Sequence, residues 1–85
     1  MLIDVREENE YEFVNMGGEL IPMGDVMMNL DKISKEKDVI VHCKSGRRSE
    51  AIVQALMARG YNNVINLEGG ITAWAQEIDT TLPTY

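Results

Sequence analysis

The chain has 85 residues, a net charge of −6, 45% hydrophobic residues and 26% charged residues. This length suits one domain with one core, spanning residues 1–85, and the composition is that of a folded rather than a disordered protein. The acidic balance argues against nucleic acid as a partner, no apolar run is long enough to cross a membrane, and the first residues lack the features of a signal peptide. A single cysteine cannot form an internal disulfide, so a reducing, cytoplasmic compartment is expected.

The first half of the chain predicts a strand followed by two helices. Residues 2–6 form the strand, with Ile3 and Val5 as its apolar positions. Residues 7–15 form a short helix, because the segment begins with acidic side chains and ends before two glycines. Residues 24–33 carry apolar side chains at helical spacing, which predicts a second, amphipathic helix.

The most informative stretch joins a buried strand to a helix through a short cationic loop. The strand, Val39-Ile40-Val41, is entirely β-branched, which is typical of a strand covered on both faces. From Ala51 onward, apolar residues repeat at helical spacing. The segment between them holds the only cysteine, one glycine and three cations, namely Cys43, Gly46, Lys44, Arg47 and Arg48.

This composition predicts an anion-binding loop around a reactive sulfur. Gly46 allows the loop to turn its backbone N–H groups inward beside the helix N-terminus. Those groups, the helix dipole and the side chains of Lys44, Arg47 and Arg48 favour thiolate, so the pKa of Cys43 is expected below its usual range. A lone cysteine is more often a small buried hydrophobe. A structural cysteine, however, does not need a glycine and three cations within the next five positions.

The last third of the chain predicts another strand and a short helix. Residues 64–67 form the strand, and a helix containing Ile71 and Trp74 follows, with Trp74 expected in the core. Strands that alternate with helices imply a small parallel α/β sheet flanked by helices on both faces. Because parallel strands share a carboxyl edge, three segments are expected to meet at one rim. They are Asp4-Val5-Arg6, Cys43 and Glu68-Gly69-Gly70.

These motifs together resemble the rhodanese family of sulfurtransferases, and the likeness covers nearly the whole chain. It is carried by the segments Leu2-Ile3-Asp4-Val5-Arg6-Glu7, Cys43-Lys44-Ser45-Gly46-Arg47-Arg48-Ser49 and Leu67-Glu68-Gly69-Gly70-Ile71-Thr72-Ala73-Trp74. Family members usually carry a further strand and helix before the Asp-x-Arg strand, so the resemblance implies a rhodanese-like fold lacking these two elements. Residues 78–85 resemble the tail of rhodanese domains fused to adenylylating enzymes of molybdopterin and thiamin sulfur transfer.

The loop length separates this family from its relatives. Rhodaneses are known for a six-residue loop, whereas related phosphatases and arsenate reductases place an arginine at the sixth position after the cysteine. Here that position is Ser49, and the last arginine of the loop is Arg48. The resemblance therefore favours a loop sized for sulfur over a phosphatase loop.

The resemblance implies that Cys43 attacks the outer sulfur of thiosulfate or of another persulfide donor and carries it as a persulfide to a thiol or an acceptor protein. The loop residues would bind the anionic donor, with Asp4 and Arg6 in support; the loop set is Lys44, Ser45, Gly46, Arg47 and Arg48. Arg48 is expected to close the loop against the helix. No metal or cofactor is expected, since one Cys and one His fall short of a zinc set, and His42 is expected to be a packed strand residue.

Two other classes of function stay open. The domain could bind a partner protein through the same rim without turning over sulfur. It could also be a thiol redox sensor or an oxyanion reductase, because a reactive, accessible thiolate is also what peroxide oxidises. Transfer of sulfur from thiosulfate to Cys43 distinguishes a sulfurtransferase from a partner-binding module, a redox sensor and an oxyanion reductase.

Overall fold

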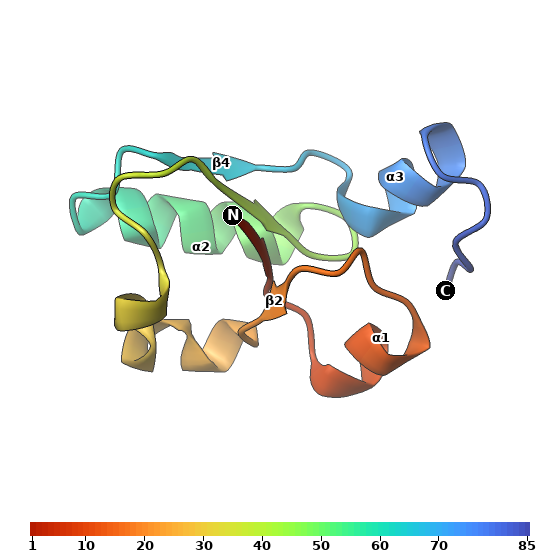
Figure 1. Cartoon of the computed structure of the whole chain (residues 1–85), viewed down its shortest axis with the longest axis horizontal. Helices are drawn as coiled ribbons and strands as arrows, with labels where there is room; N and C mark the ends of the chain where they lie inside the picture. Colours follow the sequence, from red (N-terminus) through yellow and green to blue (C-terminus); the bar gives the residue numbers. More distant parts are fainter.

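The computed structural model describes residues 1–85 and has a four-stranded sheet at its centre (Figure 1). In chain order the strands are β1 (Leu2–Asp4), β2 (Glu19–Leu20), β3 (Val39–His42) and β4 (Val64–Asn66). Their order across the sheet is β2-β1-β3-β4, and all three pairs are parallel. The predicted parallel α/β sheet is confirmed, and all four strands end at the same edge.

Helical segments connect these strands, and helices lie on both faces of the sheet, as predicted (Figure 1). In chain order they are α1 (Glu8–Phe13), η1 (Met23–Met28), η2 (Leu30–Lys32), α2 (Arg47–Ala58) and α3 (Gly70–Glu77). None of them reaches the length and hydrophobicity that crossing a bilayer requires.

The amphipathic helix predicted over residues 24–33 is wrong in type, since this segment forms the two 3₁₀ helices η1 and η2. The break falls at Asn29, whose φ of −125° lies outside the helical range. Its side chain donates to the carbonyl of Asp25 at 2.8 Å and holds the chain in a turn. Gly24 also lowers the helical propensity of the segment. The apolar spacing nevertheless predicts the buried side chains correctly for Val26 and Ile33, which both lie in the core.

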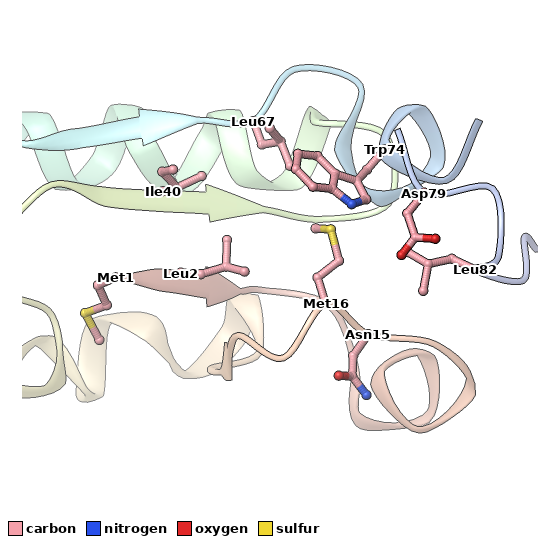
Figure 2. Close-up of a pocket in the computed structure, with 9 residues that line it drawn as sticks. All are labelled: Met1, Leu2, Asn15, Met16, Ile40, Leu67, Trp74, Asp79 and Leu82. Carbon is pink, nitrogen blue, oxygen red and sulfur yellow. The ribbon is translucent and has the colours of Figure 1, made fainter. Parts of the chain in front are cut away.

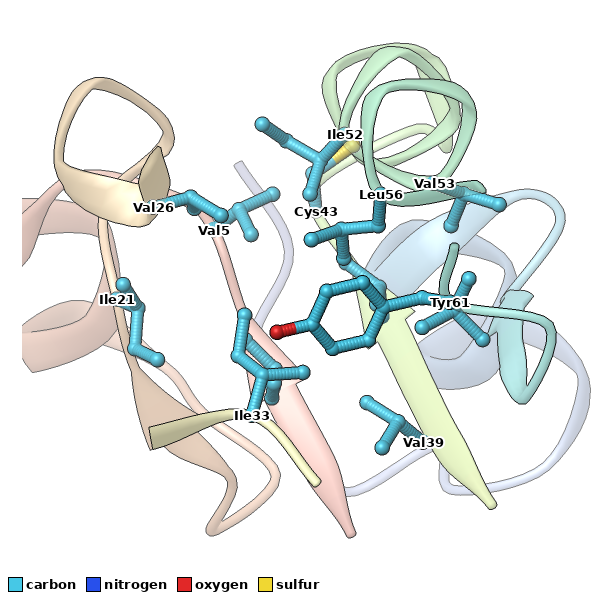
Figure 3. Packing of buried hydrophobic residues seen from close by; sticks show 13 residues of the cluster. Val5, Ile21, Val26, Ile33, Val39, Cys43, Ile52, Val53, Leu56 and Tyr61 are labelled. Atoms are coloured by element: carbon cyan, nitrogen blue, oxygen red, sulfur yellow. The ribbon is translucent and has the colours of Figure 1, made fainter. Parts of the chain in front are cut away.

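The main core lies between α2, η1 and one face of the sheet (Figure 3). Val39 and Val41 of β3 point into it, together with Leu56 of α2, and each is 0% exposed. Cys43 belongs to the same cluster and is 1% exposed. The nucleophile predicted from the sequence is therefore held by the core rather than by a surface loop alone.

The opposite face of the sheet is covered only in part, and Trp74 lies there. Trp74 was predicted to be a core residue, but it is half-buried and lines a groove with Leu2 and Ile40 (Figure 2). The reason is its position on α3, which starts beyond the carboxyl edge of the sheet and reaches only that end of the face. Ile40 and Ile65, on the strands of this face, are left 38% and 51% exposed.

Candidate functional site

The predicted loop lies at the carboxyl end of β3 and leads directly into α2. Strand β3 ends at His42 and α2 begins at Arg47, so Cys43 is the first residue beyond the strand. Gly46 has a φ of 99°, a left-handed conformation that side chains rarely adopt, and its backbone N–H donates to Cys43 Sγ at 3.1 Å. Glycine at this position thus turns a backbone donor toward the sulfur.

Ser49, in the first turn of α2, supplies two further donors to the sulfur. Its backbone N–H and its hydroxyl lie 3.5 and 3.4 Å from Cys43 Sγ. Burial acts to raise the pKa of Cys43, but the hydrogen bonds from Ser49, Gly46 and Ser45 together lower it below its ordinary value. The lowered pKa agrees with the prediction. The backbone N–H groups of the loop contribute to it, as predicted, and the largest lowering effect comes from the hydroxyl of Ser49.

The sequence interpretation missed Ser49 as a site residue, because it used this position only to measure the loop. A small hydroxyl residue in the first turn of a helix that starts at a nucleophile loop was the available signal. Asn66, at the end of β4, was missed too. Its amide oxygen lies 2.5 Å from Ser49 Oγ, and its amide nitrogen donates to the carbonyl of Gly46 at 3.3 Å.

The three loop cations have different surroundings. Arg47 is exposed, and no side-chain bond involves it, whereas Arg48 makes two hydrogen bonds of 2.8 and 2.9 Å to the carboxylate of Glu10 in α1. The Lys44 ammonium lies 4.5 Å from the centre of the Tyr85 ring. The Tyr85 hydroxyl donates to Glu10 at 2.8 Å. Glu10 and Tyr85, which are not loop residues, thus connect Arg48 at one end of the loop with Lys44 at the other.

The Glu10–Arg48 pair is strongly ionic. The hydrogen bonds from Arg48 lower the pKa of Glu10 to about 2, against the opposing effect of burial. The same bonds raise the pKa of Arg48, whose charge also interacts favourably with the Cys43 thiolate. Arg48 therefore connects the loop to α1, whereas the sequence predicted a contact with the helix that follows the loop.

Asp4 and Arg6 lie at the same edge and are both 0% exposed. Arg6 donates to both carboxylate oxygens of Asp4, with its shortest bond at 2.7 Å, and also to the carbonyl of Val14 at 2.7 Å and to the Tyr85 hydroxyl at 2.9 Å. No bond joins either side chain to Cys43. Arg6 is connected to the loop through Tyr85, whose ring lies beside Lys44, and the supporting role of Asp4 and Arg6 stays a prediction.

His42 is a packed strand residue, as predicted, and is 0% exposed. Burial lowers its pKa, although the carboxylate of Asp4 acts in the opposite direction. Its Nε2 lies 3.6 Å from that carboxylate. The imidazole is therefore part of the buried layer beneath the loop.

The start of α3 completes the rim. The backbone N–H groups of Ile71 and Thr72 donate to the carbonyls of Cys43 and Lys44 at 3.0 and 3.1 Å. A Cβ atom at Gly70 would lie 2.4 Å from the Lys44 carbonyl oxygen, so only glycine allows this approach. The prediction that three strand ends meet at one edge is confirmed. The segment after β4 contacts the loop through backbone hydrogen bonds.

Comparisons with known proteins agree with this geometry. Residues 1–77 match the family described as the rhodanese-like domain. The chain is 38% identical over 77 residues to a sulfurtransferase of Allochromatium vinosum, covering 89% of this chain and 72% of that protein. It is 32% identical over 87 residues to the probable adenylyltransferase/sulfurtransferase MoeZ of Mycobacterium tuberculosis, covering 99% of this chain but only 22% of the longer protein.

The fold has a close match among solved structures. A rhodanese-related protein of Thermoplasma volcanium superposes with a TM-score of 0.85 at 32% identity, covering 92% of this chain and 78% of that one. The match extends over most of both chains, and the family match includes β1, the loop around Cys43 and α3. This chain therefore belongs to the family of rhodanese-like domains.

Proposed function

We propose that this domain is a sulfurtransferase that moves sulfane sulfur through a persulfide on Cys43. The observation that carries the proposal is the sulfur atom itself, which is held in a short loop by donors from Gly46 and Ser49. Those donors stabilise a thiolate, and a thiolate is the nucleophile that sulfur transfer needs. Relatives named as sulfurtransferases support the same class of reaction.

The proposed reaction has two displacement steps at sulfur. In the first, a lone pair of the Cys43 thiolate forms a bond to the outer sulfur of thiosulfate, and the S–S bond of the donor breaks. The electron pair of that bond leaves with sulfite, and the negative charge of the enzyme now resides on the terminal persulfide sulfur. In the second step an acceptor thiolate attacks this terminal sulfur and releases the Cys43 thiolate.

The loop residues have separate roles in this proposal. The backbone N–H groups of residues 44–48 hold the terminal sulfur, as preorganised donors hold a developing anion. Lys44, Arg47 and Arg48 give an otherwise acidic molecule a positive mouth, which draws an anionic donor to the loop. Arg47 is the cation most open to solvent, so it is the one that meets the donor first.

Intact mass spectrometry tests the proposal directly. After incubation with thiosulfate, the chain should gain one sulfur atom, and dithiothreitol or cyanide should remove it. Cys43→Ser is the control and should gain nothing. A second incubation with inorganic polysulfide separates donor choice from the reaction itself. If neither donor loads a chain whose Cys43 still alkylates, the sulfurtransferase proposal is wrong, and the partner-binding and redox-sensor alternatives take its place.

A further inference from the structure

Asn66 touches both groups that hold the sulfur. Its amide oxygen lies 2.5 Å from the hydroxyl of Ser49, and its amide nitrogen donates to the carbonyl of Gly46, whose own N–H donates to Cys43. The reversed amide would place an oxygen against the Gly46 carbonyl, two acceptors facing each other, so the contacts fix its orientation. Asn66 therefore presents an acceptor to Ser49.

The hydroxyl of Ser49 has one proton and two acceptors. Asn66 Oδ1 lies at 2.5 Å and Cys43 Sγ at 3.4 Å from Ser49 Oγ. Ser49 is 0% exposed, so bulk water does not solvate the hydroxyl. A hydroxyl donates one hydrogen bond at a time, so a bond to the sulfur is made only when the bond to Asn66 is given up.

We propose that Asn66 is a positioning residue that competes with Cys43 for the hydroxyl proton of Ser49. In the thiol form the hydroxyl donates to Asn66, and its oxygen can accept the S–H of Cys43. In the thiolate form the hydroxyl turns to the sulfur. In the persulfide, the charge has moved to the terminal sulfur, and the hydroxyl returns to Asn66; this last step alone rests on the proposed function.

This competition has a consequence for reactivity. A thiolate that is fully hydrogen-bonded is stable but a weaker nucleophile, because nucleophilicity falls as the thiol pKa falls. By accepting the Ser49 proton in the thiol form, Asn66 keeps the pKa of Cys43 higher, so the thiolate is more nucleophilic once it forms. Asn66 thus acts on the rate of attack through Ser49, without touching the donor molecule.

The test compares Asn66→Ala with Asn66→Asp by the pH dependence of Cys43 alkylation with iodoacetamide. Removing the competing acceptor frees the Ser49 proton for the thiolate, so in Asn66→Ala the midpoint moves to lower pH by roughly half to one pH unit, the size of one neutral hydrogen bond. In Asn66→Asp a charged acceptor holds the proton more firmly and repels the thiolate, so the midpoint moves to higher pH.

A purely structural role for Asn66 gives a different result. Loss of the amide would then loosen the loop and move the midpoint to higher pH in both variants. The Ser49→Ala background supplies the second readout, because there the effect of Asn66→Ala should vanish. Asn66→Leu keeps the size of the side chain and replaces Asn66→Ala if the smaller residue prevents folding.

The control is Asn62→Ala, which changes an exposed asparagine in the turn before β4. Its midpoint should equal that of the unchanged chain. The other charged and titratable groups around the loop stay the same in every variant, and they are Lys44, Arg47, Arg48, His42, Asp4, Arg6, Glu10 and Tyr85. An upward or absent change in Asn66→Ala, or a change that persists without the Ser49 hydroxyl, overturns the proposal. Alkylation needs no sulfur donor, so this outcome is independent of whether thiosulfate loads Cys43.

Discussion

At the scale of single residues, the site depends on small groups placed close to one sulfur atom. Ser49 supplies a hydroxyl and a backbone N–H, and Gly46 supplies a backbone N–H, to a thiol that is 1% exposed. A buried thiolate without such donors would be unstable, because burial alone disfavours charge. No side chain of a loop cation donates a hydrogen bond to the sulfur, although the charge of Arg48 interacts favourably with the thiolate.

Ser49→Ala should therefore raise the pKa of Cys43. The variant loses the hydroxyl donor but keeps the backbone N–H donor. Loss of one hydrogen bond to the thiolate should raise the midpoint of the alkylation curve by about one pH unit. The matched control is Ser45→Ala, since the Ser45 side chain is exposed and only its backbone acts on the thiol. An unchanged midpoint in Ser49→Ala would show that its hydroxyl does not serve the sulfur.

Gly70→Ala should destabilise the fold strongly. The added Cβ would lie 2.4 Å from the carbonyl oxygen of Lys44 and 2.5 Å from that of Cys43, and the residue has a φ of 58°. We expect a loss of roughly 3 kcal/mol or more in the free energy of unfolding, measured by urea denaturation.

The control for this substitution is Gly24→Ala. No atom lies within 4 Å of a Cβ there, and φ is not in the left-handed region. Its free energy of unfolding should change by less than about 1 kcal/mol. Equal effects of the two substitutions would mean that the contact between α3 and the loop tolerates displacement.

At the scale of elements, α1 and α2 are connected across the loop by Glu10 and Arg48. Two charge-assisted hydrogen bonds of 2.8 and 2.9 Å join them, and the Glu10 side chain is 14% exposed. Because Arg48 is the last residue of the predicted loop, this contact fixes the loop to the N-terminal half of the chain. The capping of α1 uses the same carboxylate, which accepts the N–H of Glu7 at 2.9 Å.

Glu10→Gln should lower stability in a pH-dependent way. The pKa of Glu10 falls from 4.5 to about 2 on folding, so the stabilisation is complete above pH 4.5 and is lost as the pH falls from there toward 2. With allowance for partial exposure of Arg48, the loss at pH 7 is roughly 1 to 3 kcal/mol.

Urea denaturation at several pH values measures this difference. The gap between the unchanged chain and Glu10→Gln should narrow below pH 4.5, whereas Glu12→Gln, which changes an exposed glutamate of the same helix, should leave stability nearly unchanged at every pH. A gap that is constant down to pH 2 would contradict the assignment of the effect to ionised Glu10.

The same scale shows what could be predicted from the sequence. β1, β3, α2 and the final strand and helix carry strong local patterns, so the parallel sheet and the rim follow from them. The 3₁₀ geometry of residues 24–33 depends on a turn at Asn29, which apolar spacing does not reveal. Within the site, the loop was predicted because its residues are contiguous in the sequence. Asn66 and Tyr85 were not, because their roles arise from contacts between distant elements. Ser49 was missed although its contact with Cys43 is local, because the position was used only to measure the loop.

At the scale of the whole molecule, Arg6 is the central buried contact. Its guanidinium binds Asp4 of β1, the carbonyl of Val14 after α1, and the hydroxyl of Tyr85. Burial opposes its charge, but the hydrogen bonds that Arg6 donates to Asp4 and Tyr85 outweigh this effect and raise the pKa of Arg6. One cation thus joins the sheet, the first helix and the last residue in the sequence.

Arg6→Leu should be strongly destabilising, because it leaves the buried carboxylate of Asp4 without its partner. Breaking one side of a buried pair costs about 3 to 5 kcal/mol in the free energy of unfolding. The double variant Asp4→Leu with Arg6→Leu removes both charges and should recover part of this loss. Urea denaturation of the three chains measures the coupling, and a double variant less stable than Arg6→Leu would show that Asp4 has other essential contacts.

The parallel sheet also determines how the site comes into being. With no antiparallel pair in the sheet, no strand forms a hairpin with its neighbour, and every pairing waits for a crossover. The contacts around the loop are just as distant: Arg48 and Glu10 are 38 positions apart, and Tyr85 and Glu10 are 75 positions apart. Folding must bring these distant residues together, at a cost in chain entropy, before their contacts can stabilise the chain. This small chain therefore belongs with slow-folding topologies. In a partly folded chain that has not yet made these contacts, Cys43 is therefore exposed while the loop around it is still unformed.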